Sequence, residues 1–331
     1  MTDQFAQQPT TLTVAQVADR GSAVLDEVAT LVVGMREPLK VALAAILGGG
    51  HVLFEDVPGL GKTLAARSLA TALGLAFRRV QCTPDLLPSD ITGSSVFDPS
   101  TASFTFRPGP VFAGLLLADE INRTAPKTQS ALLEAMAERQ VTVDGTTYPL
   151  PEPFHVVATS NPVEYEGTYP LPEAQLDRFM VRLAVGYPVR DDEVDVLSRR
   201  LARRTEVGSV RTIVDSETLL AMQAGVEAVH VEGDILRYCV DLAAATRAHG
   251  AVEVGASPRG SQALVLVARS LAVLHGRDFV TPEDVKAVAV PALAHRLSLT
   301  PQAWATGTAP EGVVGDVLRT TAGPTTTRRT A

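Results

Sequence analysis

Residues Val52 to Thr63 read VLFEDVPGLGKT, in which a short apolar run leads through a glycine-bearing loop into a helical pattern. A continuous apolar run of this length is typical of a buried parallel strand. Glycines let the backbone of such a loop approach a phosphate, and the following helix N-terminus points its N–H groups at the anion. We therefore expect a nucleotide site in which Lys62 contacts the β- and γ-phosphates and the Thr63 hydroxyl binds Mg²⁺.

The loop departs from the strict phosphate-binding motif at one position. The pattern G-x-x-x-x-G-K-[ST] requires glycine where this chain has Asp56. On the loop alone, a second interpretation is a strand-to-helix turn that uses Gly59 and Gly61 only for their geometry.

A second element supplies the acidic residues that nucleotide hydrolysis needs. The run LLLADE spans Leu115 to Glu120, an apolar strand that ends in two adjacent carboxylates. Ligands of open α/β sheets bind at the carboxyl ends of the strands. There Asp119 would hold Mg²⁺ through water, and Glu120 would polarise the attacking water. Acidic residues also end strands for solubility, but their position after the loop favours the catalytic interpretation.

The segments around these motifs predict an α/β fold with a parallel sheet. Val156 to Ala158 is a further apolar run, while Lys62 to Leu73 and Ala125 to Arg139 have helical spacing. Alternating strands and helices favour a P-loop sheet with helices on both faces. Beyond about residue 190 the chain is rich in Ala, Val, Leu and Arg with helical periodicity. We expect a separate, smaller α-helical domain there.

Composition is that of an ordinary globular protein and bounds the domain count. The 331 residues are 46% apolar and 20% charged, a length suited to two domains. We expect a disordered N-terminus over residues 1–13, a P-loop ATPase core over 14–190 and an α-helical domain over 191–305. Residues 306–331 are expected to form a disordered tail.

Charge and targeting patterns exclude several other classes. A net charge of −8 argues against non-specific binding of nucleic acid. No apolar run approaches the ~20 residues that a helix needs to cross a bilayer. The first residues lack the pattern of a signal peptide, so we expect a cytoplasmic protein with Cys82 and Cys239 as buried, reduced thiols. A basic cluster at residues 199–204 ends a helix that begins with acids, and its match to the helix dipole favours a solvated helix.

A longer signature resembles a known family. The run ATSNPVEYEGTYPLPEAQLDRF spans Ala158 to Phe179, and DEINR spans Asp119 to Arg123. Both resemble the MoxR family of AAA+ ATPases, and the resemblance covers about residues 15 to 305. Proteins of this family tolerate Asp at the position of Asp56. The resemblance implies ATP and Mg²⁺ as cofactors, and it implies that the helical domain is a lid with ATP bound between it and the P-loop domain. It also implies assembly into a ring, a hexamer by expectation.

The resemblance assigns roles to three further residues. Asn161 is similar to the sensor 1 residue that orients the lytic water, although an Asn that caps a turn is the alternative. Arg178 is similar to the arginine finger that a neighbouring subunit presents to the γ-phosphate, an effect worth ~10³–10⁵ in rate. Arg123 is its rival for that role, and a local ion pair between Asp177 and Arg178 is the plainer alternative. Arg259 is similar to sensor 2, acting within its own subunit or across an interface, or it merely begins a lid helix.

The full set of predicted nucleotide-binding residues is Asp56, Val57, Pro58, Gly59, Leu60, Gly61, Lys62, Thr63, Leu64, Asp119 and Arg259. The predicted catalytic residues are Lys62, Glu120, Asn161 and Arg178.

Two hairpin patterns interrupt the strand–helix alternation. Asp144-Gly145 is a favoured tight-turn pair between two short β-patterns, and a looser hairpin candidate spans residues 96–106. They resemble the pre-sensor 1 and helix 2 insertions shared by MoxR proteins, magnesium chelatase subunits and MCM helicases. Phe104 and Phe106 would either grip the moved partner or be buried under the insertion.

The resemblance implies a chaperone-like motor that remodels, matures or activates partner proteins, often ones with von Willebrand factor A domains. Two other kinds of ATP-driven motor remain as alternative functions. One is a chelatase-like ATPase for metal insertion, and the other is a DNA-associated helicase or loader whose turnover DNA would stimulate in a salt-sensitive way. A nucleotide switch without hydrolysis is a weaker alternative, since Asp119, Glu120, Asn161 and Arg178 are all present.

Overall fold

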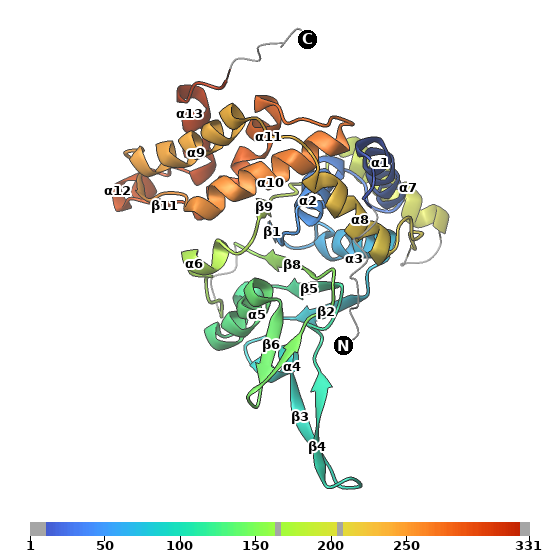
Figure 1. Ribbon diagram of the computed structural model, residues 1–331. Coiled ribbons are helices and arrows are strands. Elements are labelled where there is room, and N and C mark those ends of the chain that lie inside the picture. Colours follow the sequence, from blue (N-terminus) through green and yellow to red (C-terminus); the bar gives the residue numbers. More distant parts are fainter. Residues whose placement is uncertain (1–10, 163–166, 204–207, 325–331) are drawn as a thin grey trace, which may run out of the picture.

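The computed structural model describes residues 11–162, 167–203 and 208–324. At its centre is a five-stranded sheet in the order β2–β5–β8–β1–β9, and all its pairings are parallel (Figure 1). The strands are β1 (Val52–Glu55), β2 (Phe77–Gln81), β5 (Leu115–Asp119), β8 (His155–Ser160) and β9 (Val181–Leu183). The three apolar runs predicted as strands are all in this sheet, which confirms the expected α/β class.

Each face of the sheet buries its own apolar cluster. Along β5, Leu116 belongs to one cluster while Leu115 and Leu117 belong to the other, as the alternation of side chains in a strand requires. Burial on both faces explains why the parallel strands read as continuous apolar runs. On the first face lie α4 (Pro88–Thr92) and α5 (Pro126–Glu138).

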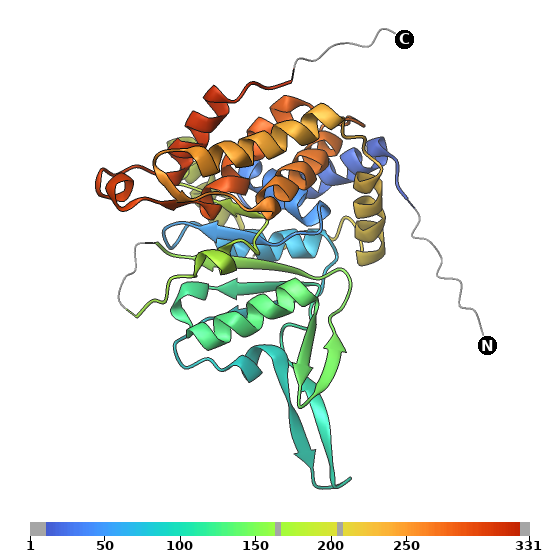
Figure 2. The same ribbon diagram turned by 60° about the vertical axis from the view of Figure 1, so that its left-hand side comes forward.

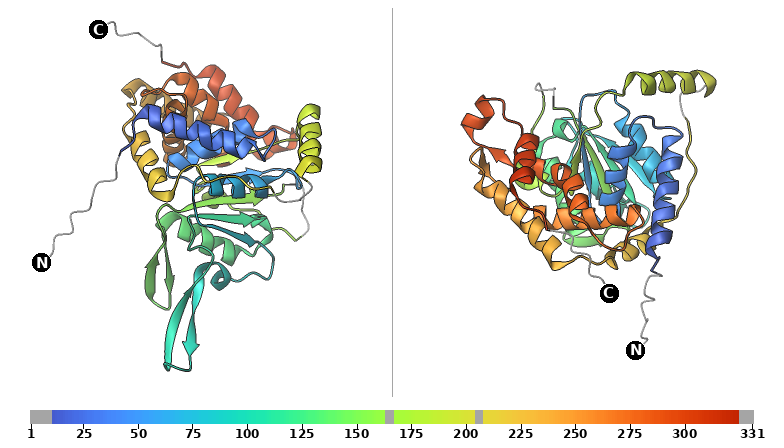
Figure 3. Two further views of the ribbon diagram at one scale, coloured as in Figure 1. Left: turned by 90° about the vertical axis from the view of Figure 1, so that its right-hand side faces the viewer. Right: turned by 90° about the horizontal axis from the view of Figure 1, so that it is seen from above.

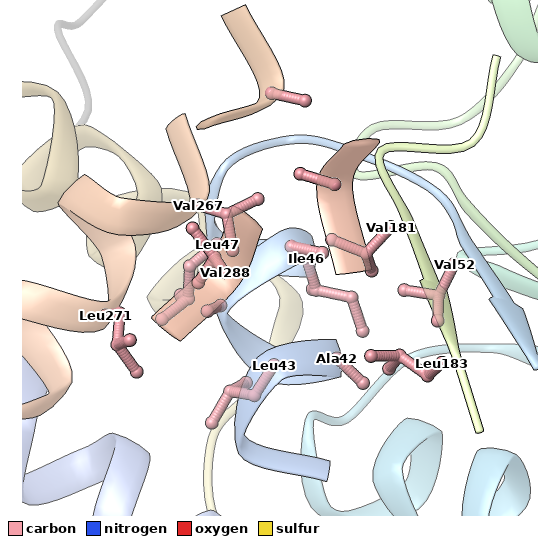
Figure 4. Packing of buried hydrophobic residues seen from close by; sticks show 14 of the residues in the cluster. Ala42, Leu43, Ile46, Leu47, Val52, Val181, Leu183, Val267, Leu271 and Val288 are labelled. Atoms are coloured by element: carbon pink, nitrogen blue, oxygen red, sulfur yellow. The ribbon is translucent and has the colours of Figure 1, made fainter. Parts of the chain in front are cut away.

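The second cluster runs from the sheet into the lid. Its helices are α1 (Val14–Ala29), α2 (Arg36–Leu47) and α3 (Lys62–Ala72), joined by lid helices. Figure 4 shows Ile46 and Leu47 of α2 between Val181 of β9 and Val267 of the lid helix α10 (Pro258–Leu274). Because one buried helix serves both parts, the lid is packed directly onto the core.

The C-terminal part is helical, as predicted. It comprises α8 (Ser216–Glu227), α9 (Gly233–Ala248), β10 (Val252–Val254), α10 (Pro258–Leu274), α11 (Pro282–Leu293), the 3₁₀ turn η2 (Ala294–Arg296), β11 (Ser298–Leu299), α12 (Pro301–Ala305) and α13 (Pro310–Thr320). The expectation of a disordered tail over residues 306–331 was wrong for α13. Val313, Val314 and Val317 are buried because this helix packs against α9 and α11 (Figure 2). Among the described residues, no helix is long and apolar enough to cross a membrane.

Both predicted hairpins form, and the longer one extends away from the body on the side opposite the lid (Figures 1 and 2). They are β3 (Gly93–Asp98) with β4 (Ser103–Pro108), and β6 (Gln140–Val143) with β7 (Thr146–Pro149). Asp144 and Gly145 both have positive φ, as the predicted tight turn requires. The two phenylalanines differ: Phe104 is 73% exposed, whereas Phe106 stacks on Tyr148 of the second hairpin with 3.9 Å between ring centroids.

The basic cluster lies on α7 (Arg190–Arg203), a helix that projects from the body (Figure 3). Its first turn carries Asp191, Asp192 and Glu193, which places acids at the positive end of the helix dipole. Arg199 pairs with Asp195 at 2.7 Å. Residues 204–207, including Arg204, and the side chain of Arg203 lie outside the described part.

Candidate nucleotide-binding site

The loop between β1 and α3 has the backbone geometry that phosphate binding requires. Gly59 and Gly61 have φ values of +83° and +81°, which L side chains rarely adopt. Gly61 caps α3, so the first N–H groups of that helix are available to an anion. Lys62 begins the helix, and its Nζ donates to the backbone carbonyls of Asp56 and Ser160. Burial lowers the pKa of Lys62, while nearby carboxylates act in the opposite direction.

Asp56 stands where the strict motif has glycine, and its contacts explain why the substitution is tolerated. The backbone at Asp56 has no positive φ, so glycine is not required there. Its Oδ1 accepts from the N–H of Val57 at 2.8 Å, and its Oδ2 accepts from the N–H groups of Val185 at 2.8 Å and Gly186 at 2.6 Å. Asp56 thereby ties the loop to the segment that follows β9.

Thr63 and Asp119 lie close enough to bind one metal ion together. The Thr63 hydroxyl donates to Oδ2 of Asp119 at 3.0 Å. In nucleotide sites Mg²⁺ takes one or two protein oxygens and completes its shell with water and phosphate oxygens, and this pair fits that requirement. Asp119 has two further contacts: Arg79 of β2 pairs with Oδ2 at 2.8 Å, and the Thr159 hydroxyl of β8 donates to Oδ1 at 2.6 Å.

Glu120 follows Asp119 in a backbone conformation that is unusual for glutamate. Its φ of 59° and ψ of 52° are left-handed, a conformation that costs about 1–3 kcal/mol and needs support from the surroundings. Part of that support is a hydrogen bond from the Glu120 N–H to the Thr159 hydroxyl at 2.8 Å. Its Oε2 accepts from Gln81 at 2.8 Å and from Arg123 at 3.1 Å. The carboxylate is therefore held at the edge of the site, within reach of a water molecule.

Asn161 lies directly after β8 and is 4% exposed. Its carbonyl accepts from the side-chain amide of Asn122 at 3.1 Å, which connects the two quoted signature runs. The structure thus places Asn161 on the same side of the sheet edge as Glu120. Residues 163–166 of the longer signature lie outside the described part.

These residues line two adjoining pockets. The phosphate pocket has a volume of about 250 Å³ and is lined by Pro58, Gly59, Leu60, Gly61, Lys62, Thr63, Arg79, Gln81, Asp119, Glu120, Thr159, Ser160 and Asn161. An apolar pocket of about 430 Å³ shares Pro58 to Gly61 with it and includes Val32, Met35, Leu64 and Tyr187. A polar pocket that opens into an apolar one suits a nucleotide, with its charged phosphates and aromatic base.

The helices of the lid do not border the two nucleotide pockets. Within the described ranges, helices α8 to α13 line neither of them, so these helices do not support the predicted position of ATP between core and lid, which stays a prediction. The physical reason is that α10 packs along α2, which directs its N-terminus away from the phosphate loop.

Comparisons with known proteins agree with this geometry. Residues 51–181 match the model of the ATPase family associated with various cellular activities, AAA, and residues 244–317 match that of the AAA lid domain. The chain is 43% identical to the chaperone MoxR1 of Mycobacterium tuberculosis over 90% of its own length and 81% of the relative. The chain belongs to the MoxR family of AAA ATPases.

Other relatives support this assignment to the MoxR family. The chain is 48% identical to the uncharacterized protein YeaC of Bacillus subtilis, over 90% of this chain and 92% of the relative. A solved structure of a candidate ATPase from Cytophaga hutchinsonii superimposes with a TM-score of 0.87 at 40% identity, covering 94% of this chain and 97% of that one. Magnesium-chelatase subunits are more distant, such as one from Acidiphilium rubrum at 30% identity over 69% of this chain.

In this MoxR-family ATPase, Arg178 and Arg259 lie together in a third pocket, of about 270 Å³. This arginine pocket also includes Arg139 and Arg296, and it has no lining residue in common with the phosphate pocket. Arg178 follows the short helix α6 (Glu173–Leu176), and its Nη1 donates to the carbonyl of Leu133. Sequence reasoning placed both Arg178 and Arg259 at a nucleotide, and the structure brings them to each other rather than to the phosphate loop of their own chain.

The alternatives weighed for these arginines have different outcomes. Asp177 pairs with Arg296 of η2 at 2.8 Å, so its ion pair is with the lid and not with Arg178. Arg123 lies beside Glu120 of its own chain. Arg259 is in the first turn of α10, whose N-cap Ser257 accepts from the Arg259 N–H at 3.2 Å. Arg259 therefore does begin a lid helix, and it lines the arginine pocket as well.

Sequence reasoning missed Arg79, Gln81 and Thr159, which hold the acidic residues in place, and Asn122, which contacts Asn161. Arg79 and Gln81 flank the buried Val80 on β2, a strand beside β5 in the sheet. A period-2 pattern with one buried residue between two polar ones was the available signal. In a strand of five residues, this pattern is too short to predict a strand unless the neighbouring strand is known.

Proposed function

We propose that this chain hydrolyses ATP as a ring of identical subunits, six by the family resemblance, and uses the energy to remodel, mature or activate a partner protein. The observation that carries the proposal is the separation of Arg178 and Arg259 from the phosphate pocket of their own chain. Arginines so placed can stabilise a γ-phosphate only when a second copy brings its nucleotide to them. Repeated head-to-tail contacts of this kind close into a ring.

The two adjoining pockets divide the nucleotide between them. The triphosphate would lie along the loop from Gly59 to Thr63, and the adenine would enter the apolar pocket beside Met35 and Leu64. Mg²⁺ held by Thr63 and Asp119 would neutralise charge on the phosphates. Leu64 would thus contact the base.

Residues from two subunits would activate the attacking water and stabilise the transition state. Glu120 would accept a proton from the attacking water, and Asn161 would orient that water. The partner subunit's Arg178 would stabilise the charge that develops on the γ-phosphate. Because Arg123 already pairs with Glu120 in its own chain, Arg178 is the better candidate for the arginine finger.

The remodelling role rests on the relatives and on the hairpins. A relative that is 43% identical is named a chaperone, whereas the chelatase subunits are less similar and match less of the chain. The exposed Phe104 on the projecting β3–β4 hairpin would contact the remodelled protein, for example one with a von Willebrand factor A domain. The acidic net charge of −8 disfavours the DNA motor.

Nucleotide binding and turnover test the proposal together. With Mg²⁺, wild-type turnover per subunit is expected to rise with protein concentration, because the active site needs two copies. Lys62→Ala is expected to abolish binding of a fluorescent ATP analogue. Glu120→Gln, which keeps shape and removes the base, is expected to retain binding and lose ~10²–10⁴-fold in turnover. Turnover that is independent of concentration would rule out the ring, and stimulation by DNA would favour the DNA motor instead.

A further inference from the structure

Helix α7 carries an apolar stripe on the side that faces away from the protein. One side of the helix contacts the body: Arg199 donates to the carbonyls of Ala29 and Thr30 at 2.9 Å. At 100° per residue, Val194, Leu197 and Leu201 lie on the opposite side. All three are exposed, Leu201 by 76%.

The exposed apolar surface continues into the segment that leads to the helix. Tyr187 is 80% exposed and Val189 is 67% exposed. We call the set of Tyr187, Val189, Val194, Leu197 and Leu201 the α7 stripe. A set of exposed apolar residues of this kind, interspersed along the chain with the exposed charged residues Asp191, Glu193 and Arg200, is typical of an interaction site.

The stripe adjoins the nucleotide pockets. Tyr187 and Leu197 line the apolar pocket that shares Pro58 to Gly61 with the phosphate pocket. In Figure 1, α7 lies on the opposite side of the molecule from α6 and the lid segment α12, and the view from above in Figure 3 shows the same for α12. The stripe and the arginine pocket therefore occupy different faces, as a head-to-tail contact between copies requires.

We propose that the α7 stripe is the docking surface for a second copy of this chain. The face of the second copy that carries its arginine pocket packs against the α7 stripe of the first. The inference rests on the proposed function, since it names the surface through which a partner subunit's Arg178 reaches the phosphate pocket. The charges on the two surfaces support a second copy of this chain as the occupant. The arginine pocket contains Arg139, Arg178 and Arg259, whereas the N-terminal turn of α7 presents three consecutive carboxylates. The contact joins these opposite charges around an apolar centre.

Two charges within the stripe test the proposal. The double variant Val194→Glu/Leu201→Glu changes two stripe residues that line neither nucleotide pocket, and it is expected to stay monomeric in sedimentation velocity with Mg²⁺ and a non-hydrolysable ATP analogue, under conditions in which the wild type assembles. Its turnover is expected to fall ~10³-fold or more, the effect of losing an arginine finger. Binding of a fluorescent ATP analogue to the monomer is expected to change less than about threefold, which shows that the core still folds.

The matched control is Val240→Glu, which places the same charge on an exposed apolar residue of α9. That helix lines neither the nucleotide pockets nor the arginine pocket within the described residues. Assembly and turnover of the control are expected to equal those of the wild type. If the stripe variant assembles and turns over like the wild type, the stripe is not the subunit interface and serves another partner. If the wild type itself does not assemble, the proposed function fails rather than the choice of surface.

Cross-linking locates the contact independently of stability. A benzophenone maleimide attached to Leu201→Cys reaches the solvent side of α7. The native Cys82 and Cys239 are buried, and burial raises the pKa of each thiol to about 12, so they are expected not to compete for the label. Mixed with an isotope-labelled copy, the probe is expected to capture peptides around residues 173–180 or 257–263 of the other copy. Capture elsewhere, or only within its own chain, would overturn the proposal.

Discussion

The buried Arg296 of the lid and the partly buried Asp177 of the core form an ion pair directly before Arg178, with Nε and Oδ1 2.8 Å apart. The guanidinium also donates to the Phe179 carbonyl at 2.8 Å. Asp177 accepts in addition from the hydroxyl of Ser257 at 3.1 Å, two residues before Arg259. One carboxylate therefore connects the segments that carry both arginines of the arginine pocket, and it fixes their spacing.

Removing the Asp177 carboxylate is expected to destabilise the protein strongly. Asp177→Asn leaves the buried Arg296 without a counter-charge, which costs about 3–5 kcal/mol of unfolding free energy. In a double-mutant cycle with Arg296→Met, urea unfolding is expected to show that the double variant loses much less than the two single losses combined. Additive losses would mean that the two groups stabilise the fold independently.

The Thr159 hydroxyl is expected to matter for catalysis although it is not expected to contact ATP. It donates to Asp119 and accepts from the backbone N–H of Glu120, so it positions both acidic residues. Thr159→Val, of nearly the same shape, is expected to lower turnover ~10–100-fold, the usual loss for a residue that orients metal ligands. Thr159→Ser keeps the hydroxyl and is expected to retain most activity, as steady-state assays over a Mg²⁺ series would show. Equal losses in the two variants would point to packing instead.

The two phenylalanines of the β3–β4 hairpin are expected to respond differently to truncation. Phe106 stacks on Tyr148 and has an edge contact with Phe112, whereas Phe104 contacts mainly Phe97 within its own hairpin. Phe106→Ala is expected to cost more than about 1 kcal/mol of unfolding free energy, because it removes aromatic pairs and apolar burial. Phe104→Ala is expected to change stability by less than about 0.5 kcal/mol. Chemical denaturation measures both, and a reversed order would remove Phe106 as the link between the hairpins.

Stability is expected to fall as the pH is lowered from 7 to 5. Burial lowers the pKa of His51 to about 3 and that of His155 to about 4, from the ordinary value of 6.5. Below about pH 6.5 the unfolded chain binds protons that the folded chain excludes, so the stabilisation is complete above that pH and is lost below it. Each histidine contributes a loss of about 2 kcal/mol between pH 7 and 5.

The control for this pH dependence is an exposed histidine. Urea unfolding at pH 7 and at pH 5 is expected to show a smaller difference for His155→Gln than for the wild type, by about 2 kcal/mol. His230→Gln, at a solvent-exposed position, is expected to retain the wild-type difference. A wild-type difference in His155→Gln would show that His155 is protonated in the folded state.

Much of the fold was predictable because its local signals are strong. The phosphate loop, LLLADE and Asp144-Gly145 each combine an apolar run or turn pair with residues whose backbone needs are specific. The edge strand β2 was not predicted, because Arg78 and Arg79 interrupt its apolar pattern. Helix α13 was missed since its short apolar face is meaningful only against α9 and α11.

The site was predictable in its residue types and less so in its arrangement. Lys62, Thr63, Asp119 and Glu120 meet because the carboxyl ends of parallel strands share one edge of the sheet. The separation of Arg178 from this edge depends on how α6 and the lid pack, which no local pattern encodes. The same holds for the ion pair of Asp177 with Arg296, two residues far apart in sequence.

Mixing two inactive variants tests the shared active site most directly. Glu120→Gln and Arg178→Ala are each expected to lose at least ~10²-fold in ATP turnover when assayed alone. Combined in equal amounts, they are expected to recover partial activity, because a Glu120→Gln subunit lends its Arg178 to the intact Glu120 of its neighbour. Full activity of Arg178→Ala alone, or no recovery on mixing two folded variants, would contradict an active site shared between subunits.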